Sequence, residues 1–353
     1  TNDRIAGLSL EPADGNPINE ANRWATYVYT TVAHLSQNGI NHFEIWNEPD
    51  LGNKWNQPND PATEDTREPG WSYVDDYANM VHATTVAAQR ANPTVQLVLG
   101  APTSNDEIFI PGDPINPKPT DGWVGNAWLS VSQRGFDEPL HAIAIHSYGW
   151  SFFTPLIAAR ATELIDKPIW ITESGLSVNH CESGHICAND ENQVADYLLQ
   201  QYAYARTVDA QVIFHHRLQD DNDYHFGLYS NSGERATVTA AQMATRYLQG
   251  AIFLKDDSIM PKFTRNDFAN FSSPFVNLVF EQPNARVTVL WAHKTKPVPA
   301  GEGEIQAWGS NISLINSQGE VVYYRCDLKP GDAIPIPSLE GAPDTLLLPE
   351  NPD

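Results

Sequence analysis

Two glutamates stand out in this sequence, because each directly follows an apolar, strand-like stretch and precedes turn residues. Glu48 lies in the string WNEP at residues 46–49, and Glu173 lies in the string TESG at residues 172–175. Two carboxyl groups held at the ends of two strands can serve as acid and nucleophile, which is what hydrolysis of a glycosidic bond requires. We therefore take Glu48 and Glu173 as the candidate catalytic residues.

The surrounding sequence predicts the elements that must position these glutamates. Up to about residue 250, short β-rich apolar runs alternate with amphipathic helical segments. The expected strands are 5–10, 41–46, 95–100, 140–145, 168–172 and 210–215, and the expected helices are 19–37, 71–91, 123–133, 154–165, 191–207 and 238–249. Repeated strand–helix units of this kind predict an α/β fold with a parallel sheet.

The long loops of this region all follow strands, and they span residues 51–70, 103–122, 174–190 and 217–235. In a (β/α)8 barrel such loops build the active face, whereas in an open doubly wound sheet they lie at the switch point. No glycine-rich phosphate turn follows any of the expected strands, which argues against a nucleotide ligand.

The pattern changes after about residue 260, where alternating strands replace the strand–helix units. The expected strands are 275–281, 286–291, 304–308, 312–315 and 320–325, with 333–337 and 345–348 as two more, and a hairpin turn at 316–319. We expect an antiparallel β-sandwich here. The predicted domains are therefore a barrel at 1–255 and an accessory sandwich at 256–353.

The two glutamate strings resemble those of the clan A retaining glycoside hydrolases. In that family the acid/base glutamate follows an asparagine at the end of barrel strand 4, and the nucleophile glutamate ends strand 7. Glu48 and Glu173 are 125 residues apart, with two further strands between them, and the second of these runs into His146-Ser147-Tyr148. The resemblance covers about residues 4–250 and implies a (β/α)8 TIM barrel.

The resemblance also implies roles for individual residues. Glu48 would be the acid/base and Glu173 the nucleophile, with their carboxyl groups roughly 5–5.5 Å apart. Asn47 would hydrogen-bond the sugar 2-hydroxyl, and Tyr148 would orient Glu173. The further candidate substrate contacts are Trp46, Trp55, His146 and His215. The alternative for each of these side chains is a structural role, either capping a turn or packing against neighbouring residues.

The sequence departs from the family pattern at its start. Only 46 residues precede Asn47, and they hold one helix and at most one strand, where a clan A barrel has three strand–helix units. We therefore expect the first two strand–helix units to be missing, with incomplete sequence coverage as the leading explanation. The alternatives are a disordered N-terminal region, or a cleaved N-terminal fragment that stays associated and completes the barrel.

Charge limits the class of partner. The chain of 353 residues has 44 acidic and 21 basic side chains, which gives a formal net charge of −23. Such a chain repels nucleic acid and anionic lipid, so we expect neither as a partner. A neutral glycan, as an oligo- or polysaccharide, fits better. No apolar run approaches the roughly 18 residues of a membrane span.

Cys181 and Cys187 lie close together in a polar loop in which His180 and His185 alternate with them. A zinc site must be considered, but the spacing matches no usual structural-zinc pattern, and we favour a local disulfide. A disulfide implies an oxidising compartment, so we expect a secreted or extracellular protein, with the periplasm as the alternative. Cys326 is expected to be a buried free thiol.

The sequence thus predicts a retaining β-glycosidase that needs no metal or organic cofactor, because two carboxyl groups and water supply the chemistry. One alternative is a non-catalytic carbohydrate-binding or structural protein on a glycosidase scaffold. Another is a metal-dependent barrel hydrolase with His146, His215 and His216 as ligands. The oligomeric state stays open.

Overall fold

The computed structural model describes residues 16–49, 74–102, 123–148, 167–178, 187–188, 191–220, 225–256, 275–283, 285–295, 307–315, 321–325, 333–335 and 345–347. The expected strand 5–10, the expected helix 154–165, Trp55, Cys181 and Cys326 lie outside these residues. The chain divides into two compact units, which are described separately below. Unit 1 is Thr1–Ser147 with Pro155–Thr172, and unit 2 is Tyr148–Thr154 with Glu173–Asp353.

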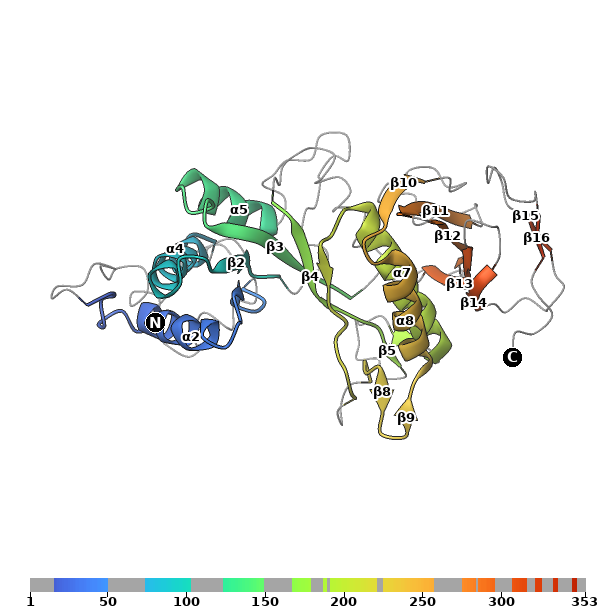
Figure 1. The fold of residues 1–353 in the computed structure, drawn as a ribbon, viewed down its shortest axis with the longest axis horizontal. Helices are drawn as coiled ribbons and strands as arrows, with labels where there is room; N and C mark the ends of the chain where they lie inside the picture. Colours follow the sequence, from blue (N-terminus) through green and yellow to red (C-terminus); the bar gives the residue numbers. More distant parts are fainter. Residues whose placement is uncertain are drawn as a thin grey trace, which may run out of the picture. The chain divides into compact units, whose positions relative to one another are not determined.

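A parallel sheet carries the candidate site, and its strand order is β1-β2-β3-β4-β7. Three of these strands, β2, β3 and β4, are labelled in Figure 1. The strands are β1 (His42–Ile45), β2 (Gln96–Leu99), β3 (Leu140–Ser147), β4 (Ile169–Ser174) and β7 (Val212–Ile213). β1 pairs in parallel with β2, with His42 opposite Gln96, and β2 pairs in parallel with β3. The predicted parallel sheet is confirmed. The boundary between the units falls inside β4, after Thr172.

Unit 1 contains the helices α2 (Arg23–Ser36), α4 (Val74–Ala91) and α5 (Trp123–Gln133), and α4 packs against both α2 and α5. Alternate strand residues, which point to one face, are almost fully buried: Ile45, Leu97, Leu99, Ile143, Ile145, Ile169 and Ile171. α2 starts four residues later than predicted, because the Asn22 side chain accepts a hydrogen bond from the Ala25 N–H and caps the helix there.

Unit 2 contains α7 (Glu191–Thr207) and α8 (Ala236–Leu248), which pack against each other (Figure 1). Its short strands are β5 (Ser177–Val178), β6 (Cys187–Ala188), β8 (Tyr229–Ser230) and β9 (Gly233–Glu234). α7 matches its predicted bounds at both ends, whereas β7 is only two residues long instead of the six expected at 210–215.

The C-terminal strands form a five-stranded antiparallel sheet in the order β10-β11-β12-β13-β14, and β15 and β16 pair separately. Their bounds are β10 (Ile252–Asp256), β11 (Phe275–Gln282), β12 (Ala285–Thr295), β13 (Ala307–Ile315), β14 (Val321–Arg325), β15 (Ala333–Pro335) and β16 (Thr345–Leu347). The antiparallel pairing is confirmed.

The prediction of two separate strands at 304–308 and 312–315 was wrong. β13 runs unbroken along β12 from residue 307 to 315, with only a register shift opposite Trp291/Ala292. The predicted domain boundary at 255/256 falls inside β10, and α7 lies alongside both β10 and β13. A sandwich of two facing sheets stays a prediction.

The fold is thus mixed α/β with a parallel sheet. Within the described residues that sheet has five strands, so the predicted eight-stranded barrel is not closed there. In the part of the chain that the structure describes, no helix is both long and apolar enough to cross a membrane.

Candidate active site

The turn after β1 has an unusual backbone. Trp46 has φ +72° and Glu48 has φ +50°, which places both in the left-handed region that side chains with a Cβ rarely adopt. Asn47, between them, is exposed. Such conformations persist only where the surroundings hold them in place, and they concentrate at functional sites.

Tyr77 of α4 is one of the groups that hold this turn. Its hydroxyl donates to the Ile45 carbonyl (3.0 Å) and accepts from the Gly100 N–H (2.8 Å), so it bridges the ends of β1 and β2. Tyr77 is fully buried, and burial raises its pKa above the ordinary value, which keeps the hydroxyl protonated. The Glu48 N–H also donates to the Ala101 carbonyl (2.9 Å).

Glycine is required at position 100 because the end of β2 approaches the backbone of the Glu48 turn closely. A Cβ at this position would lie much too near the carbonyl oxygens of Ile45 and Trp46. Because these are backbone atoms, they cannot swing away as a flexible side chain would. The end of β2 therefore lies against the Glu48 turn only because residue 100 has no side chain.

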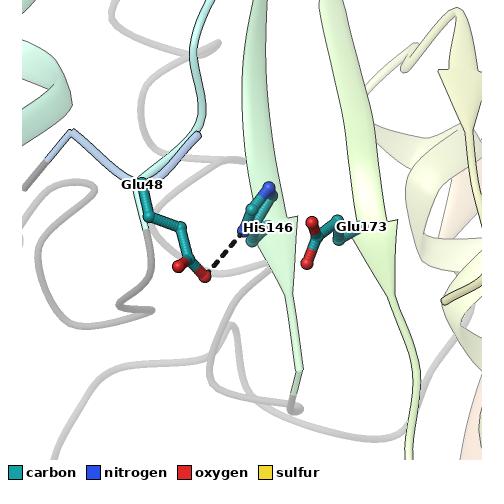
Figure 2. Close-up of side chains that lie close together, drawn as sticks. All are labelled: Glu48, His146 and Glu173. Carbon is teal, nitrogen blue, oxygen red and sulfur yellow. Dashed lines mark ion pairs between the residues drawn. The ribbon is translucent and has the colours of Figure 1, made fainter. Parts of the chain in front are cut away.

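The Glu48 carboxylate lies beside His146 of β3, with 3.4 Å between Glu48 Oε1 and His146 Nδ1 (Figure 2). The His146 side chain is 1% exposed and that of Glu48 is 21% exposed. The pair is ionic when the imidazole carries a proton. Unit 1 therefore brings two of the predicted site residues together and leaves the glutamate accessible to solvent.

Glu44 is an acidic residue within β1 itself, and it was not among the predicted site residues. Its Oε1 accepts from the Ala101 N–H (3.0 Å) and from the Thr172 hydroxyl (3.2 Å). Ala101 therefore binds Glu44 through its N–H and Glu48 through its carbonyl. The signal that could have identified Glu44 is a charged residue inside a short apolar strand, whereas no sequence pattern marks Tyr77.

In unit 2, Glu173 lies near the end of β4 (Figure 2). The Tyr148 hydroxyl donates to Glu173 Oε2 at 2.5 Å. The resemblance implied this contact, and the structure contains it.

The turn after Glu173 is held by the segment that follows β7. The Ser174 hydroxyl donates to the Phe214 carbonyl (2.7 Å), and the His216 N–H donates to the Ser174 carbonyl (2.6 Å). A Cβ on Gly175 would lie 2.7 Å from the His216 carbonyl oxygen, so glycine permits this packing. His216 and Arg217 are joined by a cis peptide bond.

The Nε2 atoms of His215 and His216 both contact other groups of unit 2. His215 Nε2 lies 2.8 Å from the Phe226 carbonyl, and burial lowers the pKa of His215 to about 4. The ring is therefore neutral at pH 7, with Nε2–H as the donor. The Arg217 guanidinium lies 3.3 Å and 3.2 Å from His216 Nε2. The Arg217 cation disfavours a metal ion at His216 Nε2.

Trp46 packs against unit 1 through its ring. It lies edge-on to Trp24, with 5.6 Å between ring centroids, and the Trp24 Nε1–H donates to the Thr84 hydroxyl (2.8 Å). Part of the Trp46 ring is thus used in packing against α2. Cys187 lies in β6, and its predicted disulfide partner Cys181 is outside the described residues.

No family model and no curated protein matches this chain. Among solved structures, a glucosidase from Croceicoccus marinus is similar with TM-score 0.46 and 15% identity, over 83% of this chain and 57% of that one. A GH30 endoxylanase from Clostridium papyrosolvens C71 has TM-score 0.46 and 12% identity, over 78% and 57%. A mutant of P fluorescens subsp. cellulosa xylanase A, in complex with xylopentaose, has TM-score 0.42 and 13% identity, over 66% and 72%. The chain thus spans 57% of the length of the first two structures.

Proposed function

We propose that this protein is a retaining glycoside hydrolase that cleaves a neutral β-linked glycan through a covalent glycosyl-enzyme intermediate. Glu48 is the acid/base and Glu173 the nucleophile. One observation carries the proposal: each glutamate stands at the carboxyl end of a strand of the parallel sheet, and each carboxylate has its own partner, His146 or Tyr148. Carboxyl ends of parallel strands are where α/β enzymes place their catalytic groups.

In the first step of the proposed reaction, a Glu173 carboxylate oxygen attacks the anomeric carbon and the bond to the leaving oxygen breaks. Glu48 gives its proton to that oxygen, so the aglycone leaves as an alcohol. In the second step Glu48 takes a proton from water. The resulting hydroxide equivalent attacks the same carbon, displaces Glu173 and regenerates both groups.

The neighbouring residues serve these steps. Tyr148 holds the Glu173 carboxylate in one orientation through its hydroxyl, and orientation of a nucleophile is worth orders of magnitude in rate. His146 lies beside Glu48, where it limits the positions that the carboxyl group adopts. Asn47, exposed at the tip of the turn, is the proposed donor to the sugar 2-hydroxyl.

The proposed substrate class follows from charge. With a net charge of −23, the chain repels polyanionic glycans over the range of its electrostatic field. A neutral oligo- or polysaccharide meets no such repulsion.

The cysteines Cys181 and Cys187 support an oxidising compartment, because a disulfide between them would persist only there. If they are paired, we expect the mass of the protein to be about 2 Da lower before reduction than after it.

The test is covalent labelling. The protein is incubated with 2-deoxy-2-fluoro aryl glycosides of gluco, xylo and manno configuration, and digested peptides are analysed by mass spectrometry. We expect the fluorosugar on Glu173, no label in Glu173→Gln, and unchanged labelling in the exposed control Glu20→Gln. The proposal fails if the whole panel leaves the protein unlabelled and Glu48→Gln cleaves aryl glycosides as fast as the wild type does. A wild-type protein that binds glycans but cleaves none of them would instead favour a carbohydrate-binding protein.

A further inference from the structure

A buried ion pair ties together the loop that follows β7. The side chains of Asp220 and Arg235 are 4% and 5% exposed, and Arg235 Nη2 contacts Asp220 Oδ2. Arg235 also lies at the N-cap of α8, and its Nη1 is 3.5 Å from Glu191 Oε1 of α7. A buried charge pair of this kind becomes strongly destabilising when one partner is removed, so the two ends of the loop are held together.

The other carboxylate oxygen of Asp220 binds the loop itself. Oδ1 accepts from the Gly227 N–H at 2.8 Å. A Cβ on Gly227 would collide with the backbone nitrogen of Asp220 and the carbonyl oxygen of Tyr229, so this approach depends on glycine. The position of residue 227 is therefore determined by Asp220, and Phe226 is its immediate neighbour.

Phe226 is also fixed by its own contacts. Its carbonyl lies 2.8 Å from His215 Nε2, and a Cβ on Gly175 would come within 3.0 Å of its ring. On either side, the Val178 N–H donates to the His225 carbonyl (3.1 Å) and the Leu228 N–H donates to the Arg217 carbonyl (3.1 Å). The ring thus has a defined place beside the strand end that carries Glu173.

Three aromatic rings meet at this place. Phe226 lies edge-on to Tyr148 and to His216, with centroid separations of 5.7 Å and 5.6 Å, and Tyr148 lies 5.9 Å from His216. Edge-to-face contacts at these distances favour particular ring orientations. Tyr148, whose hydroxyl binds Glu173, is therefore held on its ring side by Phe226 and His216.

We propose that Phe226 is a positioning residue for Glu173, and that the Asp220–Arg235 pair fixes Phe226 in that role. The chain of contacts runs from the ion pair through Gly227 to Phe226, from the Phe226 ring to Tyr148, and from the Tyr148 hydroxyl to Glu173. Every member lies in unit 2. The catalytic consequence rests on the proposed function, whereas the effect on Tyr148 does not.

The direct test is the crystal structure of Phe226→Leu beside that of the wild type. Leucine keeps apolar bulk but removes the ring edge. We expect the Tyr148 hydroxyl to lose its hydrogen bond to Glu173 in Phe226→Leu and to keep it in Phe226→Tyr. A bond that persists unchanged in Phe226→Leu overturns the proposal, whether or not the protein has any activity.

The labelling assay adds the functional consequence. We expect Phe226→Leu to slow covalent labelling of Glu173 by about 10- to 100-fold, the loss typical of a misplaced reacting group, with the concentration for half-maximal rate unchanged. Phe226→Tyr should restore the rate. The matched control is Phe253→Leu, because Phe253 pairs with Phe280 in the C-terminal sheet. Equal rates for Phe226→Leu and the wild type contradict the positioning role, and a wild type without label contradicts the proposed function instead.

The ion pair is tested by a double-mutant cycle. Asp220→Asn keeps an acceptor oxygen for Gly227 but removes the charge that faces Arg235. If both residues act through Tyr148, the double variant with Phe226→Leu labels no more slowly than the slower single variant. Additive losses overturn the assignment of the ion pair. Phe226→Leu alone decides the role of Phe226 if Asp220→Asn does not fold.

Discussion

The two glutamates differ in the conformation of the backbone that carries them. In unit 1 the backbone around Glu48 adopts the left-handed conformation, and backbone contacts from Ala101, together with Tyr77, hold it. In unit 2 Glu173 lies within the regular strand β4, and the Tyr148 hydroxyl holds its carboxylate directly.

This difference matches the proposed roles. An acid/base gives and takes a proton in every turnover, so its position is best fixed through the backbone. A nucleophile acts as the carboxylate, and a hydroxyl donor stabilises that form while fixing its direction. We therefore predict that variants of the groups that hold the Glu48 turn, such as Tyr77, act mainly through stability, and that variants around Tyr148 act mainly through rate.

The largest effect is expected for the nucleophile. Glu173→Gln keeps the size of the side chain but removes the attacking carboxylate, so we expect kcat to fall on the order of 10⁴- to 10⁶-fold with no change in thermal unfolding. Aryl glycoside hydrolysis measures the rate, and calorimetry measures the stability. A loss of less than about tenfold would remove Glu173 from the mechanism.

Glu48→Ala is expected to have a smaller and more selective effect. General acid–base catalysis contributes about 10²- to 10⁴-fold, and the loss should be greatest for substrates with poor leaving groups. Added azide needs no general base, so it should restore turnover and yield a glycosyl azide with retained configuration. If azide gives no acceleration while Glu173→Gln is inactive, Glu48 is not the acid/base.

Tyr77→Phe tests whether the Tyr77 hydroxyl holds the backbone of the turn that carries Glu48. It leaves the buried Ile45 carbonyl and Gly100 N–H without the hydroxyl, which costs about 1–3 kcal/mol of unfolding free energy. Urea denaturation gives that value, and Tyr27→Phe, at a side chain that is 60% exposed, should cost nothing measurable. Stability equal to the wild type would show that Tyr77 does not hold the Glu48 turn.

The last expected effect is a dependence of stability on pH. The pKa of His215 is lowered from its ordinary 6.5 to about 4 in the folded chain, so between these values the unfolded chain binds the extra proton. Stability therefore falls on acidification from about pH 6.5 to pH 4, by at most about 1.4 kcal/mol per pH unit from this residue.

His215→Gln keeps a donor for the Phe226 carbonyl but does not titrate. Urea titrations at pH 7 and pH 5 should show a smaller difference in this variant than in the wild type. The exposed His34→Gln should behave as the wild type does. An unchanged pH dependence in His215→Gln would contradict neutral burial of His215.

Local pattern predicted much of the sheet. The alternation of strands and helices predicted β1 to β4 in their order along the chain, and it predicted the bounds of α5 and α7. It could do so because the hydrophobic pattern of a buried strand or an amphipathic helix depends only on residues close together in the sequence. It also placed Glu48 and Glu173 at strand ends. Strand lengths were less predictable, since β7 and β13 depend on which neighbour each strand pairs with.

The supporting residues were not predictable in the same way. Tyr77 binds Ile45, 32 positions away, and Arg235 binds Asp220, 15 positions away, and neither pair has a periodicity that marks it in the sequence. Gly100 and Gly227 are needed because other backbone segments approach them closely, and such approaches exist only once the chain has folded. The candidate reactive groups could thus be proposed from the sequence, whereas the groups that hold them could not.

The most direct test of the central claim is the configuration of the first product. An aryl β-glycoside that the protein cleaves is followed by ¹H NMR from the first minutes, before the released sugar mutarotates. Double displacement through Glu173 predicts that the β-anomer appears first and the α-anomer grows in later. An α-anomer that appears first would contradict the account, because it requires a single displacement in which neither glutamate forms a covalent bond to the sugar.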